Sequence, residues 1–261
     1  MTVRRLDPAS DLRRLLDLVS AEPPNWEHAT ARIGQRPTLI TFVNPLSLAT
    51  ARSRPCFLDE LAAFDQVYPD SILVARLARM LCGKPVARHS LDGNSLAPDL
   101  LAHCAAADLR FALVGGRKGI ARAAGRVFAQ AFGATPALCA AGYFADPAAR
   151  TDLLHRLIVE ADVVLCGMGS GVQERFLLDL ASLGWCGLGV TCGGYLDQAA
   201  EGNARYYPRL VNSLHLRAAW RMIREPSRLV PRYTVAYMPF YYGTLAVMTR
   251  RAQIATLNSL S

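Results

Sequence analysis

The stretch VEADVVLCGMGSGVQERFLLDLASL, residues 159–183, decides the fold of this chain. It opens with a short, β-branched apolar run, Val163–Cys166, which is typical of a buried strand. Glycines then alternate through residues 167–171, and apolar residues recur at helical spacing from Phe176 onward. A strand, a glycine turn and a helix in this order form an anion site, because free backbone N–H groups and the helix dipole both face the turn. Steric need alone also places glycines in such turns, so the pattern by itself leaves a purely structural interpretation open.

The same unit recurs along the chain. Residues 111–114 (FALV) predict a strand before the glycine turn 115–119, and residues 187–191 (GLGVT) predict another before the turn 193–197. Residues 38–43 (TLITFV) predict the first core strand. Strands that alternate with helices indicate a Rossmann-like α/β fold, with a mostly parallel sheet and helices on both faces.

The glycine turns follow the carboxyl ends of the predicted strands, where open α/β sheets form their ligand crevice. We therefore expect the turns to converge on one ligand-binding site. The residues expected to bind a ligand there are Gly115, Gly116, Arg117, Gly167, Gly169, Gln173, Glu174, Gly193, Gly194 and Asp197.

Two further polar residues, Asn44 and Asp70, are candidates for the chemistry. Asn44 ends the first predicted strand, where it either contacts a ligand or only opens the turn before Pro45. Asp70 precedes a predicted helix that stops at Gly83. It is either the N-cap of that helix or a carboxylate free to take a proton from an acceptor hydroxyl.

Composition narrows the class of protein. The 261 residues are 52% apolar and 19% charged, which predicts a folded chain with a sizeable core. The net charge of +8 indicates an acidic partner, and the lack of a basic arm with interleaved aromatics argues against nucleic acid. Seven scattered cysteines without a CxxC pair favour reduced thiols in the cytosol over disulfides or a zinc site. Neither a signal peptide nor a membrane-spanning run of about 18 apolar residues is expected.

The C-terminal part changes character. We divide the chain into a helical lead-in (1–36), an α/β core (37–212) and a basic, aromatic appendage (213–261). Residues 235–248 (VAYMPFYYGTLAVM) are too few to span a bilayer but suit its anionic interface, with arginines on lipid phosphates. The alternatives are packing on the domain or in a homo-oligomer interface. Arginines recur through residues 205–232, at Arg205, Arg209, Arg217, Arg221, Arg224, Arg228 and Arg232.

Phosphate-binding turns together with one carboxylate fit transfer from a nucleotide-activated donor. In such a reaction a base deprotonates a hydroxyl, which attacks the activated carbon and expels a diphosphate. The chain contains no DxD pair, which many sugar transferases use to hold a divalent metal. We therefore expect a reaction without metal or other cofactor, in which arginines, backbone N–H groups and helix dipoles stabilise the leaving group.

Several ordered motifs resemble the WecG/TagA/CpsF glycosyltransferases. GMGSGVQERF (167–176) is similar to that family's signature G-x-G-x-P-x-Q-E-x-W, and the matching segments cover roughly residues 38–233. The resemblance implies an inverting transferase that uses a UDP-sugar. It further implies a polyprenyl-diphosphate-linked saccharide as acceptor, at the cytoplasmic face of the plasma membrane, in the assembly of a surface polysaccharide such as exopolysaccharide. Such a protein would be a peripheral membrane protein.

Position by position, the resemblance implies that Asp70 is the base, that Asn44 is the active-site asparagine and that Gln173 contacts the donor. It also implies that the arginines of the appendage act on the diphosphate, namely Arg221, Arg224, Arg228 and Arg232. The chain departs from the family at Gly171, where the family has proline, at Ser71, where it has glycine, and at Phe42, where it has threonine. These departures lie near expected substrate contacts. They argue against the N-acetylmannosaminyl transfer of teichoic acid or common-antigen assembly, which stays the alternative. The basic balance of the chain is compatible with a glucuronosyl donor such as UDP-glucuronate, and another hexosyl donor is equally open.

Two other classes of function compete with this hypothesis. A nicotinamide dehydrogenase also uses glycine turns, but it places GxGxxG after its first strand, where this chain has Asn44-Pro45. A basic adaptor on a membrane surface would need the C-terminal part but not Asp70.

Overall fold

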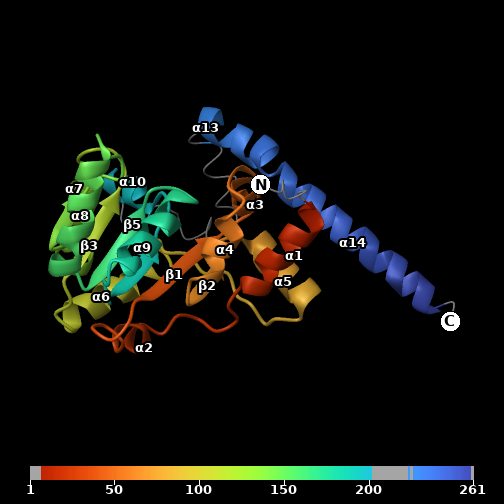
Figure 1. Ribbon diagram of the computed structural model, residues 1–261, viewed down its shortest axis with the longest axis horizontal. Helices are drawn as coiled ribbons and strands as arrows, with labels where there is room; N and C mark the ends of the chain where they lie inside the picture. The colour runs from red at the N-terminus through yellow and green to blue at the C-terminus, as the bar shows by residue number, and fades with distance from the viewer. Residues whose placement is uncertain (1–6, 202–222, 224–225, 260–261) are drawn as a thin grey trace.

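A computed structural model describes residues 7–201, 223 and 226–259 of the chain. Within this part, six parallel strands form one sheet in the order β2-β1-β6-β5-β3-β4 (Figure 1). The strands are β1 (Thr38–Val43), β2 (Gln66–Pro69), β3 (Phe111–Gly115), β4 (Leu138–Ala140), β5 (Val163–Gly167) and β6 (Leu188–Thr191). The predicted α/β fold is confirmed, and every strand pair in the described sheet is parallel.

Alternate residues of each strand face opposite sides of the sheet, so both sides need a covering layer. In β5, Val164 and Cys166 belong to one buried cluster, whereas Val163 and Leu165 belong to another. Both predicted helical layers are therefore present. The first cluster is completed by α1 (Pro8–Leu18), α3 (Leu46–Ser53), α4 (Phe57–Ala62), α5 (Ile72–Cys82), α8 (Pro147–Glu160) and α9 (Val172–Ser182), and the second by α2 (Trp26–Thr30), α6 (Ala97–Ala106), α7 (Ile120–Phe132) and α10 (Tyr195–Ala200).

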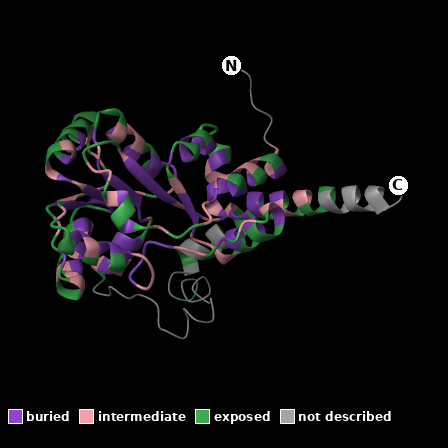
Figure 2. Cartoon of the chain, turned by 90° about the horizontal axis from the view of Figure 1, so that it is seen from below, coloured by how far each residue is buried: buried purple, intermediate pink, exposed green. Residues whose placement is uncertain are grey.

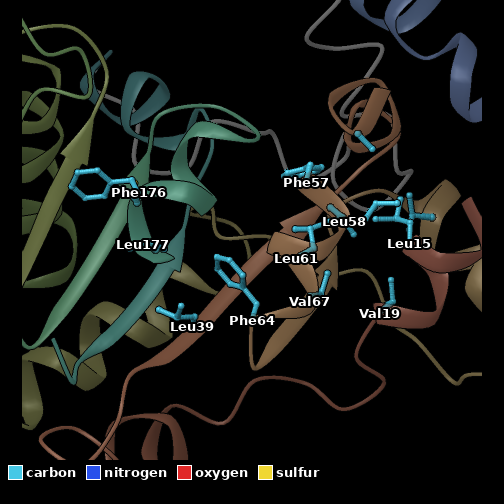
Figure 3. Packing of buried hydrophobic residues seen from close by; sticks show 14 of the residues in the cluster. Leu15, Val19, Leu39, Phe57, Leu58, Leu61, Phe64, Val67, Phe176 and Leu177 are labelled. Atoms are coloured by element: carbon cyan, nitrogen blue, oxygen red, sulfur yellow. The ribbon is translucent and has the colours of Figure 1, made fainter. Parts of the chain in front are cut away.

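The first cluster joins the two halves of the sheet. Figure 3 shows Phe57, Leu58 and Leu61 of α4 lying between Leu15 of α1 and the strands. All of these side chains are buried. Because the N-terminal helix contributes to this core, burial of its leucines helps to fix the position of β1 and β2.

The C-terminal part consists of α13 (Pro226–Pro231), the π-helix η1 (Arg232–Ala236) and α14 (Met238–Ser259). Helix α14 packs along α1, where a Cβ on Gly243 would lie only 2.6 Å from the Pro8 carbonyl oxygen. Beyond this contact the helix projects from the body of the protein (Figures 1 and 2). Several large apolar side chains of this part stay exposed, among them Tyr242 and Leu245. Of the described helices, none combines the length and apolarity that crossing a membrane requires.

Candidate active site

A cavity of about 300 Å³ lies at the carboxyl edge of the sheet. Its walls come from the segments that follow β1, β2, β3, β4, β5 and β6, as expected for a ligand crevice in an open α/β sheet. The volume lies at the lower end of the roughly 300–1,000 Å³ of small-molecule sites. The lining residues include Phe42, Asn44, Asp70, Arg88, Ser90, Asp92, Gly116, Tyr143, Gly167, Met168, Gly169, Ser170, Gln173, Gly193, Gly194, Tyr195 and Asp197.

Asn44 and Asp70 lie on neighbouring strand ends, and both line the cavity. Val43 of β1 and Pro69 of β2 are register partners, so the next residue of each strand emerges at the same level. The Asp70 amide also donates to the Val43 carbonyl oxygen at 2.8 Å. The parallel pairing of two strands therefore brings together the two residues that were predicted to carry the chemistry.

The interpretation of Asp70 as a helix N-cap is wrong. Ser71 is the N-cap of α5, because its hydroxyl accepts the Leu73 amide at 3.2 Å. The Asp70 carboxylate instead lies on the cavity wall with 40% of its side chain exposed. For Asn44 the structural interpretation is confirmed, because its Oδ1 accepts the Leu46 amide at 2.9 Å; the residue also lines the cavity, so contact with a ligand stays a prediction.

Arg88 is a member of the site that the sequence did not indicate. Its Nη2 lies 3.2 Å from Asp70 Oδ1, and its Nε donates to the Asp70 carbonyl oxygen at 2.9 Å. Nη2 also donates to Ser90 Oγ at 2.8 Å, and Ser90 in turn donates to Asp92 Oδ2 at 2.6 Å. The guanidinium group thus fixes Asp70 through both its backbone carbonyl and its side chain.

The glycine turns converge as predicted, but three of the ten expected ligand residues do not line the cavity. Gly115 is buried beneath it, and its Cα faces Gly167 so closely that a Cβ would overlap the Gly167 carbonyl oxygen. Arg117 is exposed outside the cavity, and Glu174 is buried behind its wall with 1% of the residue accessible. The other seven residues line the cavity.

Glu174 organises the site from within the core. Its carboxylate accepts the Gly171 amide at 2.5 Å, Gln173 Nε2 at 3.0 Å and Thr41 Oγ1 at 3.1 Å. The first of these bonds closes a capping box at the start of α9. Burial raises the pKa of the Glu174 carboxyl, and the hydrogen bonds it accepts partly oppose this rise. Glu174 was expected to contact the ligand, but it does not line the cavity; it supports the glycine turn from the core.

Gln173 links two glycine turns. Its Nε2 donates to Glu174, while its Oε1 accepts the Gly193 amide at 3.2 Å. The amide of Gly193 and the first N–H groups of α9 are thus already engaged, since Val172 and Gln173 donate to the Gly169 carbonyl oxygen. The amides of Gly169, Ser170 and Gly194 have no acceptor among the described residues. These three groups, rather than the helix terminus itself, are the ones that can hold an anion.

The four arginines predicted to act on the diphosphate all belong to the C-terminal part of the chain. Arg221 and Arg224 lie outside the described residues, and Arg228 and Arg232 lie on α13 and η1, respectively. Within the described ranges, no group of three or more His, Cys, Asp or Glu side chains is arranged to hold a metal ion.

Chemically, the lining of the cavity combines carboxylates, among them Asp70, with backbone amides that have no acceptor among the described residues. Asp70 can accept a proton, and the amides of Gly169, Ser170 and Gly194 can stabilise negative charge. This arrangement suits a group transfer in which a hydroxyl is deprotonated while a phosphate-type group leaves.

Comparison with known proteins agrees with this chemistry. Residues 16–254 match the family described as "Glycosyl transferase WecG/TagA/CpsF family". One relative is the UDP-Gal:alpha-D-GlcNAc-diphosphoundecaprenol beta-1,4-galactosyltransferase of Shigella boydii. It is 27% identical over 171 residues, which span 65% of this chain and 70% of the relative. The family match extends over the sheet, the cavity and most of the C-terminal helices. The chain therefore belongs to the WecG/TagA/CpsF family of glycosyl transferases.

Proposed function

We propose that this protein transfers a sugar from a UDP-sugar to a polyprenyl-diphosphate-linked saccharide, with inversion at the anomeric carbon. The observation that carries the proposal is the shared cavity of Asp70 and the glycine turns. In a direct displacement one carboxylate acts as the base, and the anomeric centre is inverted; we assign this role to Asp70, although Asp92 and Asp197 also line the cavity. The family match and the relative's substrates support transfer over the nicotinamide dehydrogenase and over a non-catalytic adaptor.

In the proposed reaction, Asp70 takes the proton from an acceptor hydroxyl, whose oxygen attacks the anomeric carbon of the donor. The bond from that carbon to the diphosphate oxygen breaks, and UDP leaves with the electron pair. Backbone amides of Gly169, Ser170 and Gly194 stabilise the diphosphate, and arginines of the C-terminal part add positive charge. The absence of a DxD pair supports a reaction that needs no metal ion.

For the donor we favour a UDP-hexose, because the Shigella boydii relative uses UDP-galactose. UDP-glucuronate is the second candidate, and it is motivated by the net charge of +8. For the acceptor we favour a polyprenyl-diphosphate-linked sugar, because the relative's acceptor is a GlcNAc-diphosphoundecaprenol. Extension of such a lipid-linked saccharide would place the protein in the biosynthesis of a bacterial surface polysaccharide.

A lipid-linked acceptor requires the protein to work at a membrane surface, and we propose its cytoplasmic face. The exposed apolar side chains of η1 and α14, which include Val235, Tyr242 and Leu245, are the candidates for contact with lipid. Truncation after residue 212 should release the protein from anionic liposomes. Unchanged co-sedimentation of the truncated protein would assign membrane contact to another surface.

The direct test is a transfer assay with purified protein. UDP-galactose, UDP-glucose, UDP-glucuronate and UDP-N-acetylmannosamine are each supplied with a synthetic N-acetylglucosaminyl-diphosphate lipid, and the product is identified by mass spectrometry. We expect one hexosylated lipid product and release of UDP. Binding of NADH in preference to all UDP-sugars, without any transfer, would refute the proposal.

A further inference from the structure

The turn between β5 and α9 has a conformation that only glycine adopts readily. Gly169 and Gly171 both have φ of +86°, in the left-handed region. A Cβ on Gly171 would lie 2.9 Å from Thr50 Cγ2 and 3.1 Å from Arg54 Nη1. Side chains from α3 and from the residue after it therefore lie directly against this turn, and they need the space that a glycine leaves.

Arg54 holds the turn through the carbonyl group of Gly171. Its Nη1 donates to the Gly171 carbonyl oxygen, while Thr50 Oγ1 donates to Ser170 Oγ at 3.3 Å. The two contacts fix consecutive residues, Ser170 and Gly171. One of these, Ser170, lines the cavity, and its backbone amide has no acceptor among the described residues.

The Arg54 guanidinium is itself anchored. Its Nη2 donates to both carboxylate oxygens of Glu60, at 2.9 Å and 3.1 Å. Glu60 is 7% exposed, so its carboxylate lies largely out of water, whereas 31% of the Arg54 side chain is exposed. Because Nη2 is held between the two carboxylate oxygens, the guanidinium is anchored on the Glu60 side and Nη1 is left to donate to the turn.

We propose that Arg54, aimed by Glu60, is a positioning residue that sets the β5–α9 turn for binding the diphosphate of the donor. It touches neither the cavity nor the reacting atoms. It acts through Gly171 and Ser170, whose geometry decides where the free amides point. This inference rests on the proposed function and names the residues that hold the diphosphate end of its site.

The test compares two ligands in calorimetric titrations of the full chain: UDP, which has the diphosphate, and uridine, which lacks it. Arg54→Met should weaken UDP binding about tenfold, the scale of one charge-assisted hydrogen bond, and leave uridine binding within about twofold. Arg54→Lys, which keeps one donor for Gly171, should recover part of the loss. Glu60→Gln should weaken UDP binding in the same selective way and serves as a second variant should Arg54→Met unfold.

Arg150→Met is the matched control. Arg150 has the same side-chain exposure as Arg54, 31%, and it pairs with Asp179 on α9 at 2.6 Å, away from the turn. Its replacement should leave the affinity for both ligands unchanged.

Three results would overturn the inference: equal UDP affinity in Arg54→Met and the wild type, a parallel loss of uridine binding, or an equal effect of Arg150→Met. Failure of the wild-type protein to bind UDP is a distinct outcome. It would remove the proposed function and this inference together.

Discussion

Replacement of Glu174 tests the view that the site depends on one buried carboxylate. In Glu174→Ala, the Gly171 amide and Gln173 Nε2 lose their acceptor, whereas Thr41 keeps its hydrogen bond to Thr191 Oγ1 at 2.9 Å. Each buried donor left without a partner costs about 1–3 kcal/mol, and relief from burying a charge offsets part of this. We expect the free energy of unfolding to fall by about 3 kcal/mol.

Glu174→Gln separates stability from binding. One amide oxygen can still accept the Gly171 amide, and the new NH₂ group can donate to Thr41. Gln173 Nε2 then faces another donor and loses its orientation. We therefore expect a loss of only about 1 kcal/mol in stability but weaker binding of UDP.

The pH dependence gives an independent check. Because burial raises the pKa of Glu174 above its ordinary 4.5, its contribution to stability is complete below that pH and is lost as pH rises through the raised pKa. The stability difference between wild type and Glu174→Gln should therefore shrink as pH rises. The measurement is denaturant unfolding of both proteins from about pH 4.5 to pH 8. Glu174→Ala as stable as the wild type, or a difference that grows with pH, would refute this reasoning.

Three further predictions concern the sheet, an ion pair and metal dependence. Gly115→Ala should lower the free energy of unfolding by about 3 kcal/mol or more, because the new Cβ would overlap the Gly167 carbonyl group. The control is Gly194→Ala, which should be as stable as the wild type because the space around Gly194 is open. Equal melting temperatures of the two variants would contradict the close approach of β3 and β5. Hydrogen bonds from Arg110 lower the pKa of Asp162 below its ordinary 3.8. Asp162→Asn should therefore lower the free energy of unfolding by about 1 kcal/mol near neutral pH. This loss should vanish as pH falls below 3.8 towards the lowered pKa. A cost that persists in urea titrations at low pH would count against the pair. Sugar transfer should continue in EDTA, and loss of activity restored by Mn²⁺ would show that a metal takes part.

The parallel strands and their glycine turns could be predicted because their signals are local. The run 38–43 forms β1 with those bounds, and the turns after β3, β5 and β6 reach one cavity. Helix α3, in contrast, was not predicted, because it buries only Ser47, Leu48 and Ala51 and so lacks a clear helical pattern. Its importance comes from a tertiary contact with the β5–α9 turn, which no local pattern encodes.

The site was predictable to the extent that its residues end strands. Asn44 and Asp70 follow paired strands, so their proximity was implied by a parallel sheet. Arg88 lies in an irregular segment, and only the tertiary structure brings it to Asp70. No motif or strand end near residue 88 could therefore predict its place in the site. Glu174 was predicted to contact the ligand because it lies in the first turn of a helix. The sequence does not show that Thr41 of β1 donates to its carboxylate within the core.

The most direct test of the central claim is the Asp70→Asn variant, assayed for sugar transfer and for UDP binding in the same preparation. Asparagine keeps the size of the side chain and one oxygen for Arg88, but it cannot take a proton at neutral pH. We predict that turnover falls at least about a hundredfold while the dissociation constant for UDP stays within about twofold. Turnover close to that of the wild type would show that Asp70 is not the base.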